Sequence, residues 1–93
     1  MKELTAFQRD LLCVISGLDK PHGVAVKDEI EEYYGREIPP GRLYPNLDEL
    51  VKADLVSKGQ HDLRTNAYIL TEQGKQRIAT HEEWISNYRV ANS

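Results

Sequence analysis

Three polar side chains recur at helical spacing between positions 42 and 49 of the chain. Arg42 is followed by Asn46 four residues later and by Glu49 three residues after that. Arginine can donate paired hydrogen bonds to guanine or to a phosphate, asparagine can pair with adenine, and glutamate can accept from the amino group of cytosine. On one face of a helix these groups would suit the base edges of a DNA duplex. The alternative is an ordinary solvated helix face.

The leucines between these groups predict the helix that must position them. Apolar residues at i, i+4 and i+7 mark one buried stripe of a helix. Here the stripe consists of Leu43, Leu47 and Leu50. We therefore expect a helix over about residues 41–53. We expect it to turn outward Arg42, Asn46 and Glu49, with Tyr44 and Asp48 beside them.

Pro45 stands within this stripe and limits where the helix can begin. A proline deep in a helix removes a hydrogen bond and clashes with the preceding turn, at a cost of about 3 kcal/mol or more. If the helix begins near Pro40 or Gly41, Pro45 lies in or just beyond the first turn, where a missing N–H costs little. Just before this helix, Ile38 could form a very short strand.

Two further helices precede this one. Thr5 and Gln8 fit a capping box, and apolar residues at helical spacing behind them predict a first helix over residues 5–18. A turn rich in glycine and proline follows. The second helix begins at Gly23 and ends at Gly35, a residue type suited to cap it.

A hairpin and a last helix follow the leucine-striped helix. Segments 55–60 and 67–71 are rich in β-forming residues and suit an antiparallel hairpin with a longer tip loop. Thr71 resembles the N-cap of a final helix over residues 72 to about 89. The layout is that of a winged helix-turn-helix: mainly α with a small β-hairpin. In such folds the third helix enters the major groove of DNA.

Polar side chains surround the expected reading helix. The hairpin and its tip offer groups for phosphate oxygens or a minor groove, namely Lys58, Arg64, Thr65 and Asn66. Lys27 lies near the start of the second helix, where free backbone N–H groups can meet a phosphate. The alternatives are a merely polar turn and an ordinary solvated lysine.

The net charge of −3 argues against nucleic-acid binding, which depends on neutralising phosphates. A winged helix that binds proteins, and not DNA, is therefore the alternative function. A third possibility is that the acidity adapts the protein to a salty interior, where attraction to phosphate is weakened. DNA binding requires that carboxylates point sideways or pair with lysines, and the decisive carboxylates are Asp48, Glu49, Asp54 and Asp62.

Nothing in the sequence indicates an enzyme, a metal site or a cofactor. His22, His61 and His81 are scattered along the chain, whereas metal ligands recur at short spacings. The lone Cys13 has apolar neighbours and is expected in the core. No apolar run approaches the roughly 18 residues of a membrane span, and the N-terminus lacks the apolar segment of a signal peptide. We therefore expect a cytoplasmic protein.

Three stretches of the chain share the pattern of one known family. They read PHGVAVKDEI, GRLYPNLDELVKADLV and RTNAYILTEQGK. The most specific positions are a glycine, a Leu-Tyr-Pro and spaced leucines, at Gly41, Leu43, Tyr44, Pro45, Leu47 and Leu50. A weaker pattern that many winged helices share is Leu70, Thr71 and Gly74. On these residues the chain resembles the PadR-like family of winged-helix transcriptional regulators.

The resemblance implies a homodimeric regulator of repressor type that binds a palindromic operator. The third helix would lie in the major groove, and the hairpin wing on the adjacent backbone or minor groove. Residues 1–71 would form the DNA-binding domain and residues 72–93 a dimerisation helix, together one compact unit. The expected dimer interface comprises Ile78, His81, Trp84, Ile85 and Tyr88. Alternatively, Trp84 and Tyr88 fold back onto the first helix.

The resemblance does not favour a small-molecule effector for this chain. Family members with a long C-terminal domain have several helices that can enclose an effector, whereas this sequence ends after one helix. A pocket, if present, would lie at the dimer interface between Trp84, Tyr88 and the first helix.

Overall fold

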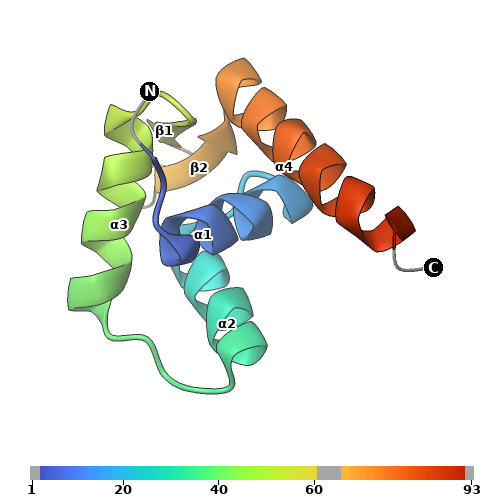
Figure 1. Cartoon of the computed structure of the whole chain (residues 1–93). Helices are drawn as coiled ribbons and strands as arrows, with labels where there is room; N and C mark the ends of the chain where they lie inside the picture. Colours follow the sequence, from blue (N-terminus) through green and yellow to red (C-terminus); the bar gives the residue numbers. More distant parts are fainter. Residues whose placement is uncertain (1–2, 61–65, 92–93) are drawn as a thin grey trace.

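The computed structural model describes residues 3–60 and 66–91 of the chain. Figure 1 shows α1, α2 and α3 grouped together, the hairpin beside α3, and α4 running away from the hairpin toward the C-terminus. The predicted order of elements, mainly α with a small antiparallel hairpin, is confirmed. The elements are α1 (Ala6–Gly17), α2 (Gly23–Tyr34), α3 (Pro40–Lys52), β1 (Val56–Gln60), β2 (Asn66–Leu70) and α4 (Glu72–Ala91).

The first two helices begin and end at the residues that the sequence indicated. The Gln8 N–H donates to Thr5 Oγ1 over 3.1 Å, and the Thr5 N–H donates to Gln8 Oε1 over 3.2 Å. The capping box is therefore complete. Gly35 ends α2 in the left-handed conformation. Of the two tyrosines before it, Tyr34 packs against the core, whereas the side chain of Tyr33 is 75% exposed.

The leucine stripe of α3 is buried as predicted, and Pro45 is the sixth residue of the helix. It therefore lies just beyond the first turn, where its missing N–H leaves only the Gly41 carbonyl without a helical donor. Gly41 is exposed, so water can reach that carbonyl. Ile38 is not in a strand; it is buried in the segment before α3, and its N–H donates to Glu31 Oε2 over 2.8 Å.

One apolar core joins all three helices of the bundle to the hairpin. Each of these elements contributes fully buried side chains, among them Leu11 and Leu12 on α1, Ile30 on α2, Leu47 and Leu50 on α3, and Val56 on β1. Cys13 does not belong to it. The expectation of a buried thiol is wrong because Cys13 faces away from the core side of α1 and is exposed.

The hairpin docks on the turn that precedes α2. The two strands pair antiparallel from Val56 opposite Leu70 to Gln60 opposite Asn66. The Tyr68 N–H donates to the Pro21 carbonyl over 2.8 Å. This extra backbone bond fixes the hairpin beside the start of α2.

The junction between α3, the hairpin and α4 is closely packed. The Thr71 hydroxyl donates to the Asp54 carbonyl over 2.7 Å and accepts from the Gly74 N–H over 3.0 Å, as an N-cap should. The backbone of Gly74 lies so close to the Leu55 carbonyl that a side chain on residue 74 would overlap it. The Leu-Thr-x-x-Gly pattern is therefore a packing requirement of this junction.

Glu31 links the end of α2 to the loop before α3. Its carboxylate accepts from the Ile38 N–H, and Lys27 Nζ lies 2.9 Å from the same oxygen. The Ile38 N–H, and then Lys27, lower the pKa of Glu31. Its ionised form is thus favoured by folding.

Because the pKa of Glu31 is lower in the folded chain, its stabilising effect should be present at neutral pH and be lost as the pH falls below the ordinary pKa of a glutamate. We expect Glu31→Gln to be less stable than the parent at pH 7, with the difference shrinking on acidification. Urea unfolding at several pH values measures this. A difference that stays constant down to pH 3 would contradict the role of the charge.

Candidate nucleic-acid interface

The exposed side of α3 is a row of residues opposite the leucine stripe. We call it the exposed row, and it consists of Gly41, Tyr44, Pro45, Asp48 and Lys52. A helix turns by about 100° per residue, so positions one and two residues after a leucine can point away from the stripe that the leucines form. The row combines an aromatic ring, a carboxylate and an ammonium group.

Asn46 does not project outward as predicted; it faces α1. Its Oδ1 accepts from Gln8 Nε2 over 3.0 Å, and its Nδ2 donates to the Arg42 carbonyl over 2.7 Å. Both ends of the amide are therefore engaged within the chain. The expected orientation is wrong because α1 packs along this flank of α3.

Arg42 and Glu49 lie on the same flank and are only partly exposed. The guanidinium of Arg42 lies over the ring of Phe7, 4.1 Å from its centroid. Glu49 lines a cavity of about 350 Å³ together with Leu4 and Gln8. The three side chains that the sequence placed outward therefore point toward α1 and the N-terminal segment, and not away from the body.

Three elements meet at a hollow of about 220 Å³, which we call the junction hollow. Its lining comes from the start of α2, from α3 and from the hairpin: His22, Gly23, Val24, Tyr44, Lys58, Asn66 and Tyr68. The start of α2 has no side-chain cap, and its first residues line this hollow. A helix N-terminus favours an anion. Predicted residues Tyr44, Lys58 and Asn66 are thus brought together.

Gly23 lets α2 and α3 approach each other at this hollow. A Cβ on residue 23 would lie 2.7 Å from Tyr44 Cε1 and 2.9 Å from its hydroxyl oxygen. Such contacts are too short for any side chain to occupy without displacing the ring. The phenol of Tyr44 therefore stands beside the first turn of α2 because residue 23 has no side chain.

The charges around the hollow are mixed. Lys58 Nζ lies 5.9 Å from the ring centroid of Tyr68. Burial raises the pKa of Tyr68, and the nearby Asp48 and Tyr44 raise it further. Asp48 therefore lies close enough to affect the ionisation of the buried Tyr68 phenol, and it is on the same surface as Lys58.

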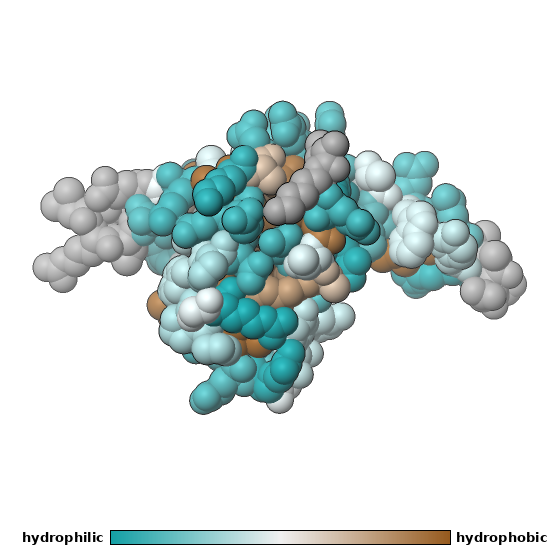
Figure 2. Space-filling model, turned by 60° about the vertical axis from the view of Figure 1, so that its left-hand side comes forward, coloured by the Kyte–Doolittle hydropathy of each residue, from teal (hydrophilic) through white to brown (hydrophobic). Residues whose placement is uncertain are grey.

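The other described carboxylates at α3 and in the turn after it lie outside the exposed row. Glu49 pairs with Lys52 at 3.9 Å. Asp54 lies in the turn after α3 and not in the exposed row, and its backbone carbonyl accepts from the Thr71 hydroxyl. Figure 2 shows the α3 side of the molecule, which is largely hydrophilic with small separate apolar areas. Of the carboxylates that decide between DNA and protein binding, Asp48 alone among the described ones stands in the exposed row.

The sequence also predicted Lys27, Arg64 and Thr65 as contact residues. Lys27 pairs with Glu31, and this hydrogen bond raises the pKa of the ammonium group. Arg64 and Thr65 lie outside the described residues.

The second half of α4 projects beyond the body of the protein. Each side chain from 82 to 89 is exposed, and Figure 1 shows this part of the helix away from the rest of the chain. Trp84 is 56% and Tyr88 60% exposed. They therefore do not fold back onto α1 within this chain, and that alternative is wrong.

Large apolar and aromatic side chains line this projecting part of α4, and we call them the α4 patch: Trp84, Ile85 and Tyr88. The ring centroids of Trp84 and Tyr88 are 5.1 Å apart, and the imidazole of His81 stacks on Trp84 at 5.7 Å. Ile78, in contrast, packs against the core of its own chain. Of the five predicted interface residues, Trp84, Ile85 and Tyr88 are therefore the exposed ones.

The comparisons with known proteins agree with this geometry. Residues 11–80 match the model of the transcriptional regulator PadR-like family. The chain belongs to the PadR-like family of transcriptional regulators. PadR-like proteins are DNA-binding regulators and not enzymes, as the sequence indicated.

Solved structures similar to this PadR-like chain include RosR of H. salinarum. RosR in a complex named RosR-S1 is 48% identical, with a TM-score of 0.90 over 95% of this chain and 78% of RosR. H. salinarum RosR grown from NaBr is 46% identical, with a TM-score of 0.91 over 99% of this chain and 83% of RosR. No curated protein matches the chain.

A more distant structure shows the same fold. F93 from STIV, a winged-helix DNA-binding protein, is 20% identical to this PadR-like chain, with a TM-score of 0.74 over 90% of this chain and 91% of F93. The winged-helix fold is thereby confirmed.

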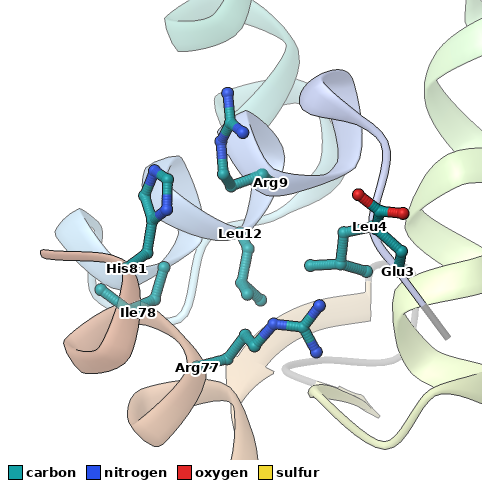
Figure 3. Close-up of a pocket in the computed structure, with 7 residues that line it drawn as sticks. All are labelled: Glu3, Leu4, Arg9, Leu12, Arg77, Ile78 and His81. Carbon is teal, nitrogen blue, oxygen red and sulfur yellow. The ribbon is translucent and has the colours of Figure 1, made fainter. Parts of the chain in front are cut away.

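A small cavity of this PadR-like chain lies between the N-terminal segment, α1 and α4. It has a volume of about 170 Å³. Figure 3 shows Arg77 of α4 extending toward Glu3 and Leu4, while Ile78, the next residue, and His81, one turn further on, stand beside α1. This cavity is not the one expected between Trp84, Tyr88 and the first helix, and the absence of an effector stays a prediction.

The part of the chain that the structure describes holds neither a group of three potential metal ligands nor a helix suited to cross a membrane.

Sequence reasoning missed Lys52 as a member of the exposed row, and it placed Asp48 only beside the outward side chains. The signal was available in the leucine spacing. With about 100° per residue, Asn46 stands next to the leucine stripe because it directly precedes Leu47, whereas Lys52 stands opposite. Pro45 was considered only for its missing N–H, although it too lies on the outer face.

Proposed function

We propose that this PadR-like regulator binds a palindromic operator as a homodimer and represses transcription. In this proposal α3 lies in the major groove, and the hairpin lies on the adjacent backbone or minor groove. As a regulator of genes, it would act in the cytoplasm, with duplex DNA and a second copy of itself as partners and without a cofactor.

The observation that carries the proposal is the junction hollow. A phosphate of the duplex could accept from the first N–H groups of α2, from the Tyr44 hydroxyl and from Lys58 at one place. Helix N-termini and lysines are common phosphate donors. With a phosphate held there, the exposed row of α3 would face the neighbouring groove.

The contact set that we propose differs from that suggested by residue types alone. Tyr44, Lys58 and Asn66 remain in it, and Arg64 and Thr65 stay predictions. Asp48 is added, since a carboxylate can accept from the amino group of cytosine. Arg42, Asn46 and Glu49 could reach DNA only by giving up contacts with α1 or Lys52.

For the dimer, we propose that the α4 patch pairs with the same patch of a second copy. An exposed tryptophan, isoleucine and tyrosine on a helix that extends beyond its own core form a surface typical of protein interfaces. A two-fold axis through α4 would place two α3 helices on one duplex, as a palindrome requires.

The charge of one lysine tests the DNA proposal. Duplexes bound by the full chain are first selected from a random pool. The affinity for the selected duplex is then measured at several salt concentrations. Lys58→Ala should reduce the slope of log affinity against log salt by about one. Lys75→Ala serves as the control, because Lys75 is also an exposed lysine and lies on α4 next to Glu72.

Equal slopes for the parent and Lys58→Ala would remove the hairpin from the proposed interface. Failure to select any duplex would favour the alternative function, a protein-interaction module. The observation that favours this alternative is the position of Asp48 in the exposed row, because a carboxylate there repels phosphates.

A further inference from the structure

The N-terminal half of α3 lacks several of the usual stabilising features of a helix. Its N-cap residue, Pro39, provides no side-chain hydrogen bond. Gly41 is a poor helix former, and Pro45 removes the donor to the Gly41 carbonyl. Tyr44 stands within this segment. The place of Tyr44 must therefore depend on contacts that α3 makes with the rest of the chain.

One buried polar side chain of α1 makes such a contact. Gln8 is only 8% exposed, although it is polar. Its Nε2 donates to Asn46 Oδ1 over 3.0 Å, and its Oε1 accepts from the Thr5 N–H over 3.2 Å. The same amide thus joins the N-cap of α1 to the middle of α3.

A second hydrogen bond links Asn46 to the N-terminal half of α3. Its Nδ2 donates to the Arg42 carbonyl over 2.7 Å. Arg42 itself lies over the ring of Phe7, one residue before Gln8. Two neighbouring residues of α1 therefore hold two positions of α3 that are one helical turn apart.

We propose that Gln8 is a positioning residue for DNA recognition: through Asn46 it holds the N-terminal half of α3, and with it Tyr44, in place against α1. The hydrogen-bonded chain replaces the stabilisation that Gly41, Pro45 and the uncapped start of α3 do not provide. Removing either amide leaves a partly buried donor or acceptor without its partner, which is a larger loss than that of an exposed bond.

The structural part of the inference is tested without DNA. We expect Gln8→Ala and Asn46→Ala each to speed hydrogen exchange of the backbone amides of residues 43, 44, 46 and 47 by about tenfold. Thr5→Ala is the matched control, since it removes the hydroxyl of the same capping box and destabilises α1 but leaves the bond between Gln8 and Asn46. Thr5→Ala should speed hydrogen exchange in α1, and it should leave exchange of the α3 amides as it is in the parent.

The functional part rests on the proposed DNA binding. For the selected duplex we expect about a tenfold weaker affinity in Gln8→Ala and in Asn46→Ala. The double variant should lose no more than either single one, because the two residues act through one bond. The salt slope should stay that of the parent, and the preference among singly substituted duplexes should shift in the same direction for both variants.

These results distinguish positioning from general destabilisation. A loss of affinity in Thr5→Ala as large as that in Gln8→Ala, or additive losses in the double variant, would overturn the proposal. So would unchanged exchange of residues 43, 44, 46 and 47 in Gln8→Ala. If the parent selects no duplex, the proposed function fails, and the exchange experiment still decides whether Gln8 holds α3.

Discussion

Trp84→Glu should convert the protein into a monomer and weaken binding to the selected duplex by about 30- to 1000-fold. The ring of Trp84 is 56% exposed in the single chain and contacts both His81 and Tyr88. If it is buried in the dimer, removing a central aromatic residue costs about 2–4 kcal/mol, and each 1.4 kcal/mol is about a tenfold change. A carboxylate in an apolar interface adds to that loss.

Light scattering and mobility shifts measure the two effects on the same samples. Tyr33→Glu is the control, because it places the same charge at a tyrosine of α2 that is 75% exposed. The control should remain dimeric and should keep its unfolding temperature. A parent chain that is monomeric at high concentration, or a Trp84→Glu variant that still dimerises, would remove the α4 patch from the proposed interface.

Gly74→Ala should lower the free energy of unfolding by about 3 kcal/mol, as expected for a severe case of overpacking. The new Cβ would overlap the Leu55 carbonyl oxygen and lie 2.8 Å from Leu70 Cδ1. A backbone oxygen cannot turn away as a flexible side chain can. The start of α4 would have to move off the junction with α3 and the hairpin. For a domain of this size, the midpoint of thermal unfolding should fall by about 12–24 °C.

A second glycine in a helix gives the matched control for this prediction. Gly41 lies in α3, and nothing stands within 4 Å of the place where its Cβ would be. Gly41→Ala should therefore raise stability by about 0.5–1 kcal/mol. The two substitutions are chemically identical, so opposite signs in thermal unfolding would show that the contact with Leu55 decides the effect. A stabilised Gly74→Ala would contradict the close packing.

The leucine spacing predicted α3 with its buried stripe, and the capping residues Thr5 and Thr71 predicted where α1 and α4 begin. These features are local, since a helical period and a cap depend on residues three or four apart. The hairpin was predicted for the same reason. The burial predicted for Cys13 was wrong, because its apolar neighbours in sequence do not share its face of the helix.

The proposed contacts to DNA were harder to predict. Residue types favoured Arg42 and Asn46 as readers, although both stand next to the leucine stripe, where α1 packs. Tyr44 and Lys58 were selected one by one, but their meeting with the start of α2 depends on Gly23. The sequence shows that residue 23 is a glycine, but it does not show that the ring of Tyr44 lies where a side chain of residue 23 would be.

The sequence by itself determined the helices, the hairpin and the buried stripe of α3, because hydrogen-bonding patterns and apolar periods are set by near neighbours along the chain. Only the tertiary structure decided which flank of α3 faces α1 and which stays exposed, and how far α4 extends beyond the core. Those outcomes depend on where distant elements pack, and the spacing of residues within one helix does not carry that information.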